Sequence, residues 1–349
     1  MLQFSNTLLS KLIVHRVGNK SLDEGYKFSD KTIEINPNDD LSKILINYFF
    51  KSFVEVPFYH FHHVTSLDLN EVYTIARSIF KSQESFVNDS KEIGRILYEY
   101  SMHPKIKNGE LYIAYFKKCL FDNKEVDAIG IFKSENKDTF LKLLFDGSDY
   151  HVDYEDGINI NKLDKGCLIL NVGKAEGYVV AVVDAISRGE EAQYWKNEFL
   201  KIIPANDNYH STQHYLDACK NFVTNQLEQE FELSRTDKIG YLNKTVEYFK
   251  KNDAFEEGEF LQEVFEDSSV IKSFKNYKEE YLLDTGNELA GSFEISEGAV
   301  KKQARVFKSV LKLDKNFHVY IHGDKSLIEK GYDEHTGKNY YKIYFDEES

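Results

Sequence analysis

The hydrophobic pattern of this sequence changes period at residue 109, and the change limits the folds open to the chain. From that point short apolar runs follow one another: ELYIAYFKKCLF, EVDAIGIFKS, DTFLKLLF, GCLILNV and GYVVAVVDAI. The turn-forming segments FDNKE, ENKD and DKG between them are too short for helical crossovers. The runs therefore predict a mainly antiparallel meander.

Helical patterns and one strand precede this meander. LSKLIVHRV reads as a strand stopped by Gly18 and Asn19, and DDLSKILINYFFKSF reads as a helix capped by Asp39 or Asp40. Two more helices are expected in LDLNEVYTIARSIF and SFVNDSKEIGRILYEYS, the second ended by the His-Pro pair at 103–104. We predict an α+β N-terminal domain, residues 1–204, in a chain of 349 residues that is long enough for two domains.

The remaining sequence, residues 205–349, predicts a helical segment followed by a small antiparallel sheet. STQHYLDACKNFVTNQLEQEF, with Ser211 as its cap, and SRTDKIGYLNKTVEYFKKN, beginning at Ser234, carry apolar residues at helical spacing. EGEFLQEVFED and SVIKSFKNYKEEYLL add two further helices. VFKSVLKL, FHVYIH and NYYKIYF then alternate as three strands of a β-meander. The fold class is therefore α+β, with a mixed N-terminal domain, a helical middle and a small C-terminal sheet.

A positive strip lies near the end of a chain whose formal net charge is −14. In AVKKQARVFKSVLKLDK, residues 299–315, six basic residues face a single acid. Mobile ammonium groups interleaved with aromatic residues suit a phosphate backbone, although lysines on the outer face of a strand also serve solubility and block edge pairing. The predicted DNA-binding residues are Lys301, Lys302, Arg305, Lys308, Lys312 and Lys315.

Three stretches resemble the bacterial nucleoid-associated protein family, the NdpA-like group. They are GINI–NKLDKGCLIL at 157–170, EEAQYWKNEFL at 190–200 and the tail FHVYIHG…IEKGYDEHTGKNYYKIYF at 317–345. The resemblance implies association with the bacterial chromosome in the cytoplasm, binding of double-stranded DNA, self-association as a homodimer and contact with topology-handling DNA enzymes. It implies no catalytic residues.

A second interpretation is an adaptor protein that docks onto a DNA-processing enzyme without binding DNA itself. Its acidic surface would steer and select a basic partner. The residues expected on that surface are Glu256, Glu257, Glu259, Glu263, Glu266 and Asp267.

The enzyme and metal motifs are incomplete. YHFHHV at 59–64 could direct His60 and His62 to one ion but offers no third ligand at motif spacing. His210 and His214 have the spacing of H-E-x-x-H without its glutamate, which favours a helix surface. We therefore expect no metal and no cofactor.

A nuclease motif and a phosphate loop also fail. EVDAIGIFK resembles a carboxylate–lysine nuclease motif, but Ile131 stands where the acid before Lys133 is needed. NVGKAEG at 171–177 lacks the P-loop pattern and reads as a hairpin turn. The sequence predicts a protein that is not an enzyme, with nuclease activity as the remaining catalytic alternative.

The number of cysteines and the lengths of the apolar runs indicate the cellular compartment of the protein. Cys119, Cys167 and Cys219 are odd in number and far apart, which argues against a disulfide framework. No apolar run approaches the roughly 18 residues of a membrane span. We expect a reduced cytoplasmic protein without a membrane partner.

Overall fold

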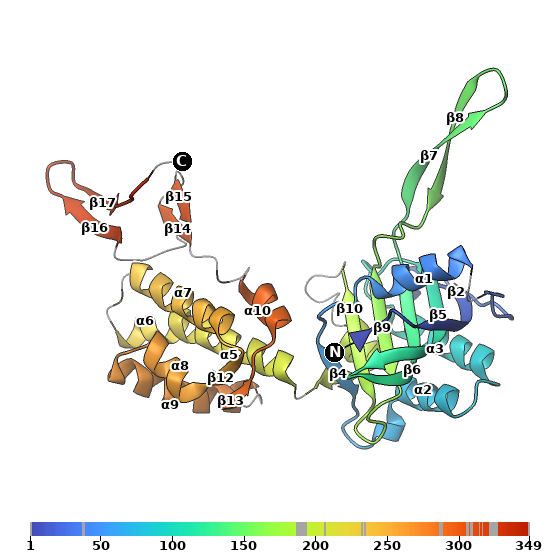
Figure 1. Cartoon of the computed structure of the whole chain (residues 1–349), viewed down its shortest axis with the longest axis horizontal. Coiled ribbons are helices and arrows are strands. Elements are labelled where there is room, and N and C mark those ends of the chain that lie inside the picture. The colour runs from blue at the N-terminus through green and yellow to red at the C-terminus, as the bar shows by residue number, and fades with distance from the viewer. Residues whose placement is uncertain are drawn as a thin grey trace. The chain divides into compact units, whose positions relative to one another are not determined.

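The structure, a computed structural model, describes most of the chain in two compact units, Met1–Ala205 and Asn206–Ser349 (Figure 1). The described residues are 2–36, 39–185, 194–205, 207–231, 233, 235–285, 289–304, 307, 310–313, 315, 317–320 and 327–347. We call the two parts the N-terminal unit and the C-terminal unit.

An antiparallel sheet forms the centre of the N-terminal unit, which confirms the strand predicted at residues 9–17 and the pairing direction expected after residue 109. The strand order is β11-β4-β10-β9-β6-β5-β2-β3, and β1 pairs with β5. The strands are β1 (Leu2–Gln3), β2 (Leu8–Val17), β3 (Tyr26–Lys27), β4 (Phe58–Phe61), β5 (Gly109–Phe121), β6 (Lys124–Ser134), β9 (Lys165–Leu170), β10 (Val179–Asp184) and β11 (Ile202–Pro204).

Helices cover both faces of this sheet, because alternate residues of the central strands are apolar on both sides. On one face, Ile131 and Cys167 share a buried cluster with α2 (Glu71–Lys81), α3 (Phe86–Tyr100) and the π-helical segment η3 (Tyr194–Leu200). On the other face, Phe132 stacks on Phe49 of α1 (Asp40–Phe50), with ring centroids 4.3 Å apart. The short 3-10 turns η1 (Lys20–Leu22) and η2 (Leu67–Leu69) complete the unit.

A separate two-stranded hairpin interrupts the predicted meander. β7 (Asp138–Phe145) pairs with β8 (Tyr150–Gly157), while β6 pairs directly with β9. The expectation that DTFLKLLF belongs to the meander is therefore wrong, and the strand at 150–157 was not predicted. Figure 1 shows this hairpin, in green, leaving the sheet of its own unit.

Helices dominate the C-terminal unit. They are α5 (Asn208–Asn221), the π-helical segment η4 (Phe222–Gln226), α6 (Leu227–Glu230), α7 (Arg235–Lys251), α8 (Glu257–Val264), α9 (Ser268–Thr285) and α10 (Glu297–Ala304), with the strand pair β12 (Ala254–Glu256) and β13 (Ser292–Glu294). The cap of α5 is Asp207, whose side chain accepts the His210 N–H, and not Ser211, which lies inside the helix. Ser234, the expected start of the next helix, lies outside the described residues.

The chain ends in two hairpins rather than one three-stranded meander. β14 (Val310–Leu313) pairs with β15 (Phe317–Tyr320), and β16 (Ile328–Asp333) pairs with β17 (Lys338–Ile343). NYYKIYF thus finds its partner in residues 328–333, a strand that the sequence analysis did not predict. Leu313 and Val319 pack near Ile239 of α7, as expected for the apolar side of the first hairpin.

Candidate functional site

Two of the predicted DNA-binding residues lie next to each other in the last turn of α10. Lys301 and Lys302 are both exposed, and the Lys301 side chain keeps 63% of its accessible surface. Lys301 Nζ lies 3.2 Å from Glu297 Oε2, one helical turn earlier, and Lys302 Nζ lies 6.0 Å from the centre of the Tyr209 ring. Exposed ion pairs of this kind contribute at most about 1 kcal/mol, so phosphate groups can compete for Lys301.

The other predicted residues fall on the first C-terminal hairpin or outside the described chain. Lys312 belongs to β14, where it is the cross-strand partner of His318, and Lys315 is exposed in the turn that follows. Arg305 and Lys308 lie outside the described residues. The structure therefore places one pair of lysines on α10 and a second pair on the β14–β15 hairpin.

Lysines lie beside much of the acidic surface expected of an adaptor. Glu257 is half-buried and accepts hydrogen bonds from Lys278 Nζ at 2.7 Å and the Tyr215 hydroxyl at 3.0 Å. In the same region Glu266 pairs with Lys244. Glu257 was expected to be a free surface charge, and this expectation is wrong. The two ion pairs also weaken the negative field that would steer a basic partner.

The histidine pairs contact protein groups. His60 Nδ1 lies 2.7 Å from the carbonyl oxygen of Tyr178, and His210 Nδ1 lies 3.0 Å from Asp207 Oδ1. His210 is buried, so the helix-surface interpretation of that residue is wrong. Burial is the main cause that lowers the pKa of His214. The described residues contain no group of three or more His, Cys, Asp or Glu side chains that could hold a metal ion.

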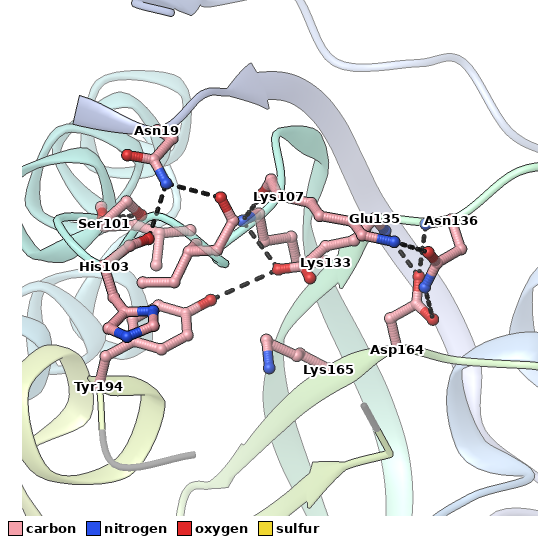
Figure 2. A network of polar contacts seen from close by, with 12 residues as sticks. Asn19, Ser101, His103, Lys107, Lys133, Glu135, Asn136, Asp164, Lys165 and Tyr194 are labelled. Atoms are coloured by element: carbon pink, nitrogen blue, oxygen red, sulfur yellow. Dashed lines mark hydrogen bonds and ion pairs between the residues drawn. The ribbon is translucent and has the colours of Figure 1, made fainter. Parts of the chain in front are cut away.

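The most concentrated polar chemistry lies inside the N-terminal unit, where two lysines are buried side by side (Figure 2). Lys133 of β6 and Lys165 of β9 are cross-strand partners, 0% and 1% exposed respectively. Lys133 Nζ lies 2.9 Å from Glu135 Oε1 and donates to the Lys107 carbonyl oxygen at 2.7 Å. Lys165 Nζ lies 2.9 Å from Asp184 Oδ1. We call these residues the buried lysine network.

Neighbouring side chains enclose this network. Asp164 accepts the backbone N–H groups of Glu135 at 2.6 Å and Asn136 at 2.9 Å, which fixes the chain as it leaves β6. The Tyr194 hydroxyl points at Glu135 Oε1, 3.5 Å away, and the Tyr194 ring lies 5.3 Å from Lys165 Nζ. Burial lowers the pKa of Lys133, while the charge of Glu135 acts in the opposite direction. A buried ammonium ion needs such a partner, because desolvation otherwise costs several kcal/mol.

This arrangement bears on the nuclease interpretation. Lys133 is the lysine of that motif, and its ammonium group is engaged by Glu135 and by a backbone carbonyl. Ile131, at the position of the missing acid, is fully buried in the core. The geometry is that of a structural ion-pair network at the ends of core strands.

Sequence analysis missed the network, although a signal for it exists. Lys165 and Asp184 stand at the ends of otherwise apolar strands, and Lys133 follows the apolar run at residues 128–132 of β6. Three charges at strand ends become informative only once the strands are known to be neighbours.

The fold and its sites are those of a two-unit α+β protein with lysines exposed near its C-terminus. The chain belongs to the family described as nucleoid-associated protein YejK, which matches residues 13–344. This confirms the predicted family. A search of curated proteins finds no match. In the part of the chain that the structure describes, every helix is too short or too polar to cross a bilayer.

Proposed function

We propose that this nucleoid-associated protein binds double-stranded DNA directly and without sequence preference, through the basic residues of its C-terminal unit. It acts without catalysis, as a homodimer in the cytoplasmic nucleoid. The observation that carries the proposal is the exposed lysine pair at the end of α10, within a strip that opposes the overall charge of −14.

Electrostatics explains why the contact must be local. A strongly acidic chain is repelled by DNA at long range, so affinity has to come from a patch where cations outnumber acids. Lysine side chains reach phosphates as mobile point charges and read no bases, which gives binding without sequence preference. Two copies of a weak patch on one dimer increase the apparent affinity without any new contact.

The test is fluorescence anisotropy of a labelled duplex at 50 and 200 mM KCl. Six phosphate contacts, one for each predicted residue, would weaken binding on the order of 10³-fold across that range. The double substitution Lys308→Glu with Lys312→Glu should nearly abolish binding and flatten the salt dependence.

A matched control distinguishes the effect of the basic patch on DNA binding from the effect of the total charge. Lys117→Glu with Lys124→Glu changes two exposed lysines of the N-terminal unit and alters the net charge by the same amount. Binding by this control should stay within a few-fold of the unmodified protein. An equal loss of DNA affinity in both variants would refute binding through the basic patch. If the unmodified protein does not bind DNA at low salt, the adaptor interpretation is favoured. Cleavage of the duplex with Mg²⁺ would contradict the non-enzymatic role.

A further inference from the structure

The β7–β8 hairpin is a ribbon with two unlike faces. Directly opposed residues of an antiparallel pair lie on the same face, so the register assigns each side chain to one side. Leu141 opposes Tyr154, Leu143 opposes Val152, and Phe145 opposes Tyr150. We call these residues the apolar face; all six are large hydrophobic side chains, between 59% and 76% exposed.

The opposite side, which we call the polar face, carries charge. Lys142 opposes Asp153, and Leu144 opposes His151. Lys142 also forms an ion pair with Glu155, the cross-strand partner of Phe140. Charged groups on this side are compatible with water, whereas the apolar face lacks any such group among its six members.

Specific contacts hold the ribbon in shape at both ends. In the turn, Asp146 accepts the backbone N–H groups of Ser148 at 2.9 Å and Asp149 at 3.0 Å, and these bonds, with His151, lower the pKa of Asp146. At the base, the Thr139 hydroxyl donates to Asp156 at 2.7 Å. The hairpin is therefore a defined element whose apolar face is presented as one surface.

Such a ribbon requires a covering partner. A two-stranded hairpin is only marginally stable by itself in water, and contiguous exposed apolar patches of several hundred Å² mark interaction sites. Six side chains at this exposure present roughly 100 Å² each, about 600 Å² in all. Pairing two such faces would bury about 1,200 Å², above the ~1,000 Å² that a specific interface needs.

We propose that the apolar face is the homodimer interface, and that it packs against the same face of a second copy. The two ribbons stack as layers with both polar faces outward, in the manner of a small β-sandwich. A self-complementary face is what a two-fold dimer uses, and none of the six side chains of the apolar face is charged. Residues 138–157 hold one lysine against six acids, so DNA is repelled by this element. The inference names the surface of the homodimer in the proposed function.

The test measures oligomeric state without DNA, so its outcome is independent of DNA binding. In sedimentation equilibrium the full chain should be a dimer. Leu143→Lys with Val152→Glu places an opposite-charge pair on the apolar face, which keeps the strands paired but cannot be buried. The dimer Kd should rise at least about 30-fold, toward monomer, which is the loss expected for a central hot spot.

The matched control is Leu144→Lys, a change on the polar face next to Leu143 that keeps His151 and its contact with Asp146. This variant should remain a dimer. Added salt should leave the association unchanged or strengthen it, opposite to its effect on DNA binding, because the interface is apolar and the hairpin is acidic. A monomeric unmodified protein, an intact dimer in the Leu143 and Val152 variant, or equal loss in both variants would overturn the proposal.

Crosslinking gives a second readout that does not depend on a destabilising change. Cys119, Cys167 and Cys219 are all buried, so a surface cysteine dominates labelling. Stacked sheets lie about 10 Å apart, beyond disulfide reach, so a short bismaleimide is the reagent. Leu143→Cys should crosslink into dimers and Leu144→Cys should not; the reverse pattern would assign the interface to the other face.

Discussion

Removing one partner of the Lys133–Glu135 pair should destabilise the N-terminal unit severely. Both side chains are almost fully buried, 0% and 3% exposed, with nitrogen and oxygen 2.9 Å apart. Lys133→Met retains most of the aliphatic chain but leaves the Glu135 carboxylate buried, with the Tyr194 hydroxyl 3.5 Å away. An uncompensated buried charge of this kind costs about 3–5 kcal/mol.

The same physics predicts rescue when both charges are removed together. Lys133→Met with Glu135→Leu replaces the pair by apolar side chains of similar volume, a change that is commonly neutral or stabilising. We expect the double variant to lie within about 1 kcal/mol of the unmodified protein. Lys20→Met, which removes an exposed pair with Glu99, is the matched control and should cost at most about 1 kcal/mol.

The single tryptophan makes the measurement specific to this unit. Trp195 is fully buried, and its ring lies beside Tyr194, with centroids 6.2 Å apart. Its fluorescence during urea unfolding therefore reports the N-terminal unit and not the helical one. With a urea slope of about 2 kcal/mol/M, Lys133→Met should lower the midpoint by roughly 2 M.

Additivity would refute this reasoning. If the double variant loses the sum of the two single losses, the charges are not coupled and the network is not an ion pair in solution. A loss below about 1 kcal/mol for Lys133→Met would show that the ammonium group is hydrated, contrary to its burial.

Two further predictions use the same fluorescence assay. Burial and the nearby charge of Lys91 lower the pKa of His15 in the folded protein from 6.5 to about 4. Between these two values the unfolded chain binds a proton at His15 and the folded protein does not. The free energy of unfolding should therefore be highest above pH 6.5 and fall by about 3 kcal/mol as the pH drops toward 4. His15→Gln should remove that slope, and an unchanged slope would assign it to another group. Gly177→Ala should cost about 3 kcal/mol or more, because φ is +101° and the new Cβ would lie 2.3 Å from a backbone oxygen. Gly173→Ala, at φ +65° with no other atom nearer than 3.6 Å, should cost only about 1 kcal/mol, and equal losses would contradict the clash.

The sequence predicted most strands of the central sheet because those strands are buried on both faces. Ile129 and Ile131 point to one cluster while Ala128 and Phe132 point to the other, so residues 128–132 of β6 form an unbroken apolar run. Short turns between such runs leave few pairings other than antiparallel ones. The apolar composition of these segments and the short connections between them were sufficient to predict antiparallel core strands.

The β7–β8 hairpin shows where local pattern fails. DTFLKLLF has the apolar content of a core strand, but whether it pairs with the sheet or leaves it depends on residues far away in sequence. Its partner, YHVDYEDG, carries several acids and no apolar run, so it was missed. Only the strand register shows that the apolar side chains gather on one face of the hairpin and the charged side chains on the other.

The candidate sites differ in the same way. A basic strip is a local property, and its lysines can be found by counting charges along the chain. The buried lysine network depends on Lys133 and Lys165 being opposed across two strands and on Asp184 following on a third. Such contacts are set by topology, which pattern analysis does not supply.

The opposed lysines also have a consequence for how the sheet assembles. If β9 aligned one position out of register, Lys165 would turn toward the layer that holds Phe49 and Phe53 and would leave the Asp184 carboxylate of β10, its partner in the native register. A chain with this wrong register would thus bury an ammonium group among aromatic rings without its carboxylate partner. The Lys165–Asp184 pair therefore favours the native alignment of β9 over one shifted by a single position.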